Sequence, residues 1–73
     1  MIETGDKRIR LATSGDVAIL TLARPEKLNA LDYEMVLALE RAAHLIEAMR
    51  DARVAIITGE GDKSFCAGGD IEA

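Results

Sequence analysis

The chain has 73 residues, a formal net charge of −4 from 9 Lys and Arg against 13 Asp and Glu, and an apolar content of 49%. This composition is typical of a folded globular protein and argues against disorder. The negative charge and scarce aromatic side chains argue against nucleic-acid binding. The longest apolar stretch, residues 17–22, is far shorter than the roughly 20 residues of a membrane span. We therefore predict neither a nucleic-acid partner nor a membrane-embedded protein.

The length leaves little room for a hydrophobic core. A domain of this size buries only about 60% of its unfolded surface. The single Cys66 cannot form an internal disulfide, and one Cys with one His cannot complete a structural zinc site. We expect no metal site, a reducing cytoplasmic setting, and a chain that is part of something larger.

The first elements expected are two strands. Residues 7–12 alternate basic and apolar side chains, which predicts a strand with Ile9 and Leu11 on its buried face and Arg8 and Arg10 in water. Residues 14–16 form a turn signal, and residues 17–22 predict a second, more buried strand. Pro25 ends that strand because it has no N–H for the ladder. Residues 7–22 therefore predict a β-hairpin.

A helix and a third strand are expected next. Apolar side chains recur every three or four residues over 32–52, and Asp32 is a good N-cap candidate, so we predict a helix there. Residues 54–58 form a continuously apolar run, which predicts a strand covered on both faces. A polar loop then leads to a second helix beginning near Ile71. The order is β-β-α-β, which predicts an α/β fold.

Two loops could carry chemistry. Residues 59–64 superficially resemble a phosphate-binding loop, but Ser64 stands where a dinucleotide fingerprint needs glycine, and Asp62 intervenes where a P-loop needs glycine directly before Lys63. We interpret this loop as a solvated turn. The residues Cys66-Ala-Gly-Gly-Asp70 suit either a tight turn with an N-cap or a backbone N–H site for a developing oxyanion. Spacing alone favours the turn.

Two segments taken together resemble one family. Ala23-Arg-Pro-Glu-Lys-Leu-Asn-Ala-Leu31 is similar to the N-terminal signature of the enoyl-CoA hydratase/isomerase (crotonase) superfamily. Ser64-Phe-Cys-Ala-Gly-Gly-Asp-Ile71 is similar to the first oxyanion-hole loop of the same superfamily. The predicted elements between the two segments match in order and length. The resemblance implies that residues 1–73 are the N-terminal β-β-α-β part of a single crotonase-like (ClpP/crotonase) domain.

The resemblance also implies a site. Members of this superfamily bind acyl-CoA thioesters and stabilise an enolate-like oxyanion with two backbone N–H groups, and they use no cofactor beyond the coenzyme A of the substrate. Ala67 matches the position of the first N–H donor. The positions implied to contact the substrate or its CoA are Lys27, Leu28, Ala30, Ala67, Gly68, Gly69, Asp70 and Ile71. Members of the superfamily form trimers or dimers of trimers.

The departure from the family is that the second oxyanion donor and the catalytic acid and base, which come later in family members, are absent from these residues. Enoyl-CoA hydratase or isomerase activity is therefore expected of a full-length protein, and these 73 residues alone are expected to be inactive. The alternative is a catalytically incomplete fragment that at most binds part of CoA. An unrelated small β-β-α-β interaction domain is a third hypothesis.

Five side chains receive structural interpretations. His44 lies in mid-helix without a partner for catalysis, and Cys66 is interpreted as a small filler. Asn29 is expected to stabilise the turn before the helix. Tyr33 and Phe65 are expected to be packing residues.

Overall fold

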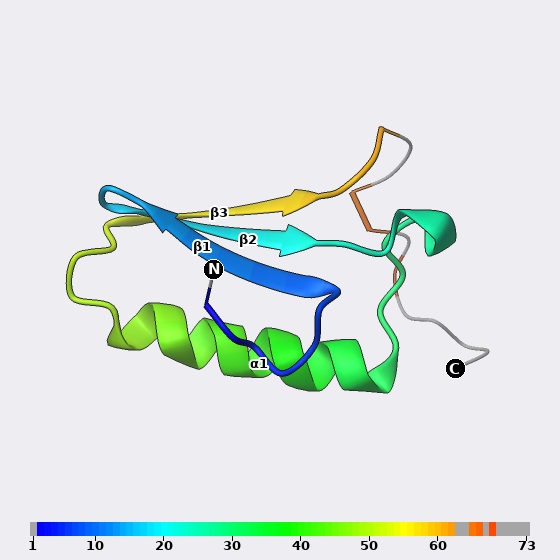
Figure 1. The fold of residues 1–73 in the computed structure, drawn as a ribbon, viewed down its shortest axis with the longest axis horizontal. Helices are drawn as coiled ribbons and strands as arrows, with labels where there is room; N and C mark the ends of the chain where they lie inside the picture. Colours follow the sequence, from blue (N-terminus) through cyan, green and yellow to red (C-terminus); the bar gives the residue numbers. More distant parts are fainter. Residues whose placement is uncertain (1, 63–64, 67, 69–73) are drawn as a thin grey trace.

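The computed structural model describes residues 2–62, 65–66 and 68. Strands β1 (Ile9–Ser14) and β2 (Val17–Leu22) are followed by a short 3₁₀ helix η1 (Pro25–Lys27), helix α1 (Tyr33–Ala48) and strand β3 (Val54–Gly59). The three strands form one sheet, and α1 runs along one side of it (Figure 1). The predicted β-β-α-β order is confirmed.

The sheet has the order β1-β2-β3. β1 and β2 are antiparallel, with Ser14 opposite Val17, so the predicted hairpin is confirmed. Gly15 turns the chain with φ 60°, a conformation that glycine adopts readily. β2 and β3 are parallel, with Val17 opposite Val54. Parallel strands need a crossover, and α1 with its flanking segments provides it.

β1 begins two residues later than predicted. Lys7 and Arg8 form a turn in place of the first strand residues, because the Asp6 carboxylate accepts a hydrogen bond from the Arg8 amide at 2.8 Å. The predicted faces are right: Ile9 and Leu11 are 1% and 0% exposed. The side chain of Arg10 remains partly in water, at 43% relative exposure.

The core lies between α1 and the β1–β2 hairpin. From α1, the apolar side chains that reach the sheet recur at helical spacing, which explains why the sequence folds with this helix face inward. The Asp32 carboxylate caps the helix as predicted, accepting from the Met35 amide at 2.9 Å. The buried core residues are Ile9, Leu11, Ala18, Leu20, Leu22, Met35, Ala38 and Ala42.

α1 is shorter than predicted. It ends at Ala48, and Met49 is already extended at φ −77° and ψ 113°, so the predicted helix end at Ala52 is wrong. The physical reason lies in the sheet, where the carbonyl of Asp16 accepts from the Arg53 amide at 2.7 Å. The chain needs residues 49–53 to pass from the helix layer to the start of β3. Tertiary pairing overrides helix propensity there.

β3 differs most from its prediction. Val54, Ile56 and Ile57 are 53%, 48% and 54% exposed, so the expectation of a strand covered on both faces is not met by the described residues. β3 stands at the edge of the sheet, beyond the part that α1 covers (Figure 1). Tyr33 and Phe65, expected to pack, are also exposed at 71% and 55%. The apolar run predicts the strand correctly, but its cover does not come from these residues.

Candidate functional site

The two segments singled out in the sequence lie at the same end of the sheet. One follows β2 and the other follows β3, and the carboxyl ends of parallel strands meet at one sheet edge. In Figure 1 the 3₁₀ helix η1 and the segment after β3 lie together at that end. The fold thus brings residues 24–31 close to the loop that begins at Gly59.

Residues 24–31 form a tight, defined turn. η1 ends where the Leu28 amide donates to the Pro25 carbonyl at 3.1 Å, and the Asn29 amide donates to the Arg24 carbonyl at 2.8 Å. Leu28 and Asn29 both have left-handed conformations, with φ 53° and 59°. Asparagine tolerates this region, whereas leucine rarely adopts it. The turn therefore presents Leu28, which is 43% exposed, at a conformational cost.

A direct backbone bond joins the two segments. The Leu31 amide donates to the Gly68 carbonyl at 2.8 Å. Gly68 has φ 103°, a conformation that residues with a side chain rarely adopt, and its amide lies 3.4 Å from Cys66 Sγ. Gly68 is exposed, so a ligand can approach its main chain closely. Cys66 also packs, partly buried, against the hydrophobic core, in agreement with its predicted role as a small filler.

Asn29 forms a second connection between the segments. Its side chain is fully buried, at 0% exposure. Its Oδ1 accepts from the Arg24 amide at 2.8 Å, which confirms the predicted role in the turn. Its Nδ2 donates to the Glu60 carbonyl at 2.9 Å, in the loop after β3. One amide side chain thus contacts both segments.

Gly59 leaves the space in which these segments meet. A Cβ at this position would come within 2.4 Å of the Phe65 carbonyl oxygen, 2.9 Å of the Phe65 Cα and 2.7 Å of Asn29 Nδ2. Two of these three atoms belong to the backbone and cannot move aside cheaply. The close approach of the two loops therefore depends on glycine at position 59.

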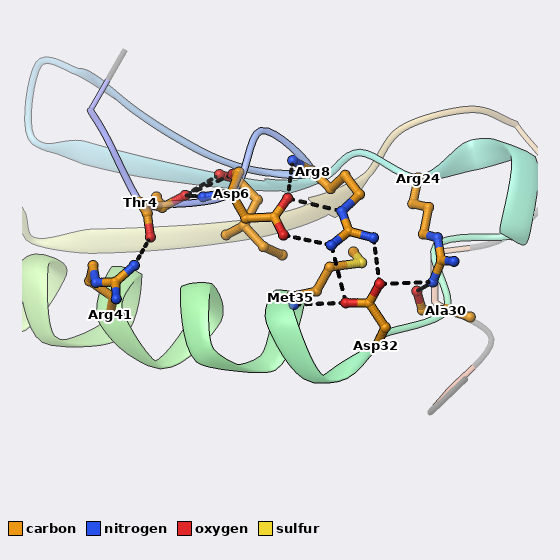
Figure 2. Close-up of polar contacts among 9 residues, drawn as sticks. Thr4, Asp6, Arg8, Arg24, Ala30, Asp32, Met35 and Arg41 are labelled. Carbon is orange, nitrogen blue, oxygen red and sulfur yellow. Dashed lines mark hydrogen bonds and ion pairs between the residues drawn. The ribbon is translucent and has the colours of Figure 1, made fainter. Parts of the chain in front are cut away.

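An ion-pair network supports the segment from the helix side (Figure 2). Arg8 Nη1 donates to Asp32 Oδ2 at 2.5 Å, and Arg8 Nη2 donates to Asp6 Oδ2 at 2.6 Å. Arg24 Nη1 lies 3.7 Å from Asp32 Oδ2 and donates to the Ala30 carbonyl at 3.2 Å. The network therefore connects the residues before β1, the start of α1 and the turn that carries Ala30.

The network shifts the acidity of its carboxylic acids. The hydrogen bond from the Arg8 side chain is the main reason why the pKa of Asp6 is lowered. The pKa of Asp32 is lowered mainly by the hydrogen bond from the Met35 amide and then by Arg8. The two carboxylates raise the pKa of Arg8 in turn. All three groups stay charged at neutral pH, which suits a structural support.

The structure places half of the predicted site residues. Lys27 and Leu28 are exposed on the turn, Ala30 is half-buried beside them, and Gly68 lies opposite, bonded to Leu31. The other predicted residues, which are Ala67, Gly69, Asp70 and Ile71, lie outside the described residues. The cross-loop bond of Asn29 and the contact between Arg24 and Ala30 were not predicted, because no sequence pattern shows which loops will meet.

Two further observations concern the described part of the chain. Within residues 2–62, 65–66 and 68, no three His, Cys, Asp or Glu side chains gather closely enough to hold a metal ion. That the reaction needs no metal or cofactor stays a prediction. Over the same residues, no helix has the length and apolar character needed to cross a bilayer.

Comparisons with known proteins address the family. Residues 17–73 match the family model described as enoyl-CoA hydratase/isomerase. The chain is 42% identical over 64 residues to the (E)-benzylidenesuccinyl-CoA hydratase of Thauera aromatica, covering 88% of this chain and 25% of that protein. It is 38% identical over 65 residues to the mitochondrial 3-hydroxyisobutyryl-CoA hydrolase of Gallus gallus, covering 89% of this chain and 17% of that protein. The chain therefore spans about a quarter or less of the length of these relatives.

Solved structures agree. The fold matches the crystal structure of an enoyl-CoA hydratase/isomerase from Mycobacterium paratuberculosis with a TM-score of 0.84 and 35% identity, covering 89% of this chain and 25% of that one. The similarity shows that the β-β-α-β elements are the N-terminal portion of a crotonase-like α/β fold, as the resemblance implied. It also removes the hypothesis of an unrelated interaction domain. The chain belongs to the enoyl-CoA hydratase/isomerase family.

Proposed function

We propose that this chain supplies an acyl-CoA binding surface and one backbone donor of an oxyanion hole, in an enzyme that stabilises the enolate of an acyl-CoA thioester. The expected activity is that of an enoyl-CoA hydratase or isomerase. The observation that carries the proposal is the 2.8 Å bond from the Leu31 amide to the Gly68 carbonyl. It joins the two segments to which the family resemblance assigns the substrate.

The proposed chemistry needs only main-chain groups on this part of the protein. The thioester oxygen accepts a hydrogen bond from the Ala67 N–H and gains negative charge as the enolate forms. A donor aimed at such a developing charge is worth about 3–4 kcal/mol of transition-state stabilisation. The exposed Gly68, with φ 103°, supports the proposal because it leaves the main chain open to a close ligand.

The binding surface is proposed to continue on both sides of this donor. Lys27 and Leu28 are exposed on the facing turn, where a cationic and an apolar side chain suit the phosphates and the pantetheine chain of CoA. The strained conformation of Leu28 supports this assignment, because such strain is often found at functional sites. Ala30 is proposed to line the same turn, and Gly69, Asp70 and Ile71 to extend the contact beyond Ala67.

The test removes the proposed donor. In the purified natural polypeptide that carries this chain, Ala67→Pro removes the N–H, and we expect kcat for hydration of a short 2-enoyl-CoA to fall by about 10²–10³-fold. Ala67→Gly keeps the N–H and serves as the matched control, with kcat expected within a few fold of the wild type. Thermal unfolding of both variants checks that they are folded. Full activity in a folded Ala67→Pro variant would falsify the assignment of the donor.

We also propose that residues 1–73 are the N-terminal part of a single crotonase-like domain. The exposed apolar side chains of β3 support this, because a larger domain would cover them. The second oxyanion donor and the catalytic acid and base would then come from other residues of that domain. A trimer or dimer of trimers and a cytoplasmic setting are part of the same proposal. Size-exclusion chromatography with light scattering tests the oligomer.

The alternative function is that of a catalytically incomplete unit that at most binds part of CoA. It rests on the sequence, since the second oxyanion donor and the catalytic acid and base of the family have no counterparts among these residues. A mass spectrum of the natural polypeptide separates the two functions. A mass equal to that of these 73 residues supports the incomplete unit, and a much larger mass supports the enzyme.

A further inference from the structure

Asn29 is an unusual side chain for its place in the fold. It is polar and yet 0% exposed, and it lies in the turn between η1 and α1. Burying an amide is costly unless both of its polar ends find partners. Its Oδ1 accepts from the Arg24 amide at 2.8 Å, and its Nδ2 donates to the Glu60 carbonyl at 2.9 Å. The position therefore needs a side chain that accepts from one backbone N–H and donates to one backbone carbonyl, and an amide does both.

The surroundings of Asn29 are shaped for this link. Its own φ of 59° suits asparagine, and a Cβ at Gly59 would lie 2.7 Å from its Nδ2. Gly59 thus leaves the gap through which the amide reaches the loop after β3. The Leu31 amide then bonds the Gly68 carbonyl at 2.8 Å, further along the same loop. The side-chain link and the backbone link hold the same two segments together.

We propose that Asn29 is a positioning residue, which sets the separation between the turn at residues 27–30 and the segment after β3 that carries Glu60 and Gly68. The inference rests on the proposed function, since those segments are the proposed substrate-binding surface. Asn29 does not itself contact the substrate. It acts through the backbone of Arg24 and Glu60, and a displacement of about 1 Å at a reacting group is enough to reduce a rate by about 10²-fold.

The isosteric variant Asn29→Asp tests the link most sharply. It keeps the shape and the acceptor but replaces the Nδ2 donor with an oxygen, which would face the Glu60 carbonyl oxygen. In the natural polypeptide we expect kcat for hydration of crotonyl-CoA to fall by about 10–100-fold, with a smaller change in KM. By hydrogen exchange, we expect the Leu31 amide to exchange at least about 10-fold faster, because its Gly68 partner is no longer held in place.

A second variant tests whether the effect of Asn29→Asp comes from the lost link or from a misfolded turn. Asn29→Gly removes the side-chain bonds to Arg24 and Glu60 but accepts the positive φ, so the turn can keep its backbone conformation. It should lower kcat and deprotect the Leu31 amide in the same way. Thr4→Val is the matched control, because Thr4 is also a buried polar side chain, 1% exposed, with hydroxyl contacts to the Ile9 and Asp6 carbonyls. It should leave both kcat and the exchange of the Leu31 amide unchanged.

The outcomes separate this inference from the proposed function. Unchanged kcat in a folded Asn29→Asp or Asn29→Gly variant overturns the positioning role, as does unchanged exchange of the Leu31 amide. Equal losses of kcat in Thr4→Val also overturn it, because they would reveal a general loss of stability. A wild-type polypeptide that neither binds nor converts acyl-CoA thioesters, crotonyl-CoA among them, refutes the proposed function instead. The exchange of the Leu31 amide in the variants then still decides whether Asn29 joins the two loops.

Discussion

The two margins of the sheet are built from similar apolar residues but have opposite environments. On the β1 margin, Ile9 and Leu11 are buried against α1, and Arg8 is paired with two carboxylates just before the strand. On the β3 margin, Ile56 and Ile57 are about half exposed. The difference teaches that an apolar run predicts a strand that is stabilised by burial. Which element buries it depends on the rest of the fold.

The margins also differ in how they serve the site. The β1 margin contributes charges, which fix the start of α1 and the turn at Ala30 through Arg24 and Asp32 (Figure 2). The β3 margin contributes backbone, through Gly59 and the loop that follows it. The site is thus supported by side chains on one side and by close main-chain approach on the other. Four sets of variants can break or sharpen this comparison.

The largest effect on stability is expected on the β1 margin, where α1 covers the strand. Leu11→Ala removes a fully buried side chain, and we expect the free energy of unfolding of the natural polypeptide to fall by about 2–5 kcal/mol. Ile57→Ala is the corresponding variant on β3. If a larger domain covers β3, as proposed, urea denaturation should give a penalty of the same order. A penalty below about 1 kcal/mol at Ile57 would mean that β3 stays bare and that the domain proposal is wrong.

The next effect concerns the close approach at Gly59. Gly59→Ala places a Cβ 2.4 Å from the Phe65 carbonyl oxygen, so the loop must shift. We expect a loss of about 1–3 kcal/mol of stability and a fall in kcat/KM together. Gly15→Ala is the matched control: its positive φ costs about 1–2 kcal/mol, but no atom lies within 4 Å of the added Cβ. Turnover equal to wild type in Gly59→Ala would contradict the tight junction of the loops.

A smaller effect is expected from acid. The folded chain lowers the pKa of Asp6 and Asp32, so below about pH 4 the unfolded chain binds more protons than the folded one. Stability from these groups is therefore present above that pH and is lost as the pH falls through the lowered values. Arg8→Gln should flatten this dependence, measured by thermal unfolding between about pH 2 and 5. An unchanged slope would show that the network does not support the β1 margin.

The smallest change in stability is expected at Leu28. Leu28→Gly relieves a left-handed leucine but adds freedom to the unfolded chain, so the free energy of unfolding should stay within about 1 kcal/mol of the wild type. If Leu28 contacts CoA as proposed, KM should rise while kcat holds, because only uniform binding is lost. Steady-state kinetics with crotonyl-CoA measures both. An unchanged KM removes Leu28 from the binding surface.

The sequence predicted what depends on local pattern. The alternation around Ile9 and the cap at Asp32 gave the hairpin and the start of α1, because these depend on neighbours along the chain. The end of α1 was missed because it is set by pairing of Arg53 with Asp16, far away in sequence. The contact between Asn29 and Glu60 was missed for the same reason. Motif resemblance singled out the two segments of the proposed site, but only the fold showed which backbone groups join them.

The bond between Leu31 and Gly68 has a consequence for the order of events during synthesis. β1 and β2 are joined by a short turn at Gly15, so their pairing is local and can form as soon as residue 22 has left the ribosome. The bond that joins the two loops needs the carbonyl of Gly68, which is synthesised well after residue 22. The hairpin pairing is therefore the first of these contacts that the nascent chain can make, and the bond that joins the two segments of the proposed site forms only after residue 68 has been made.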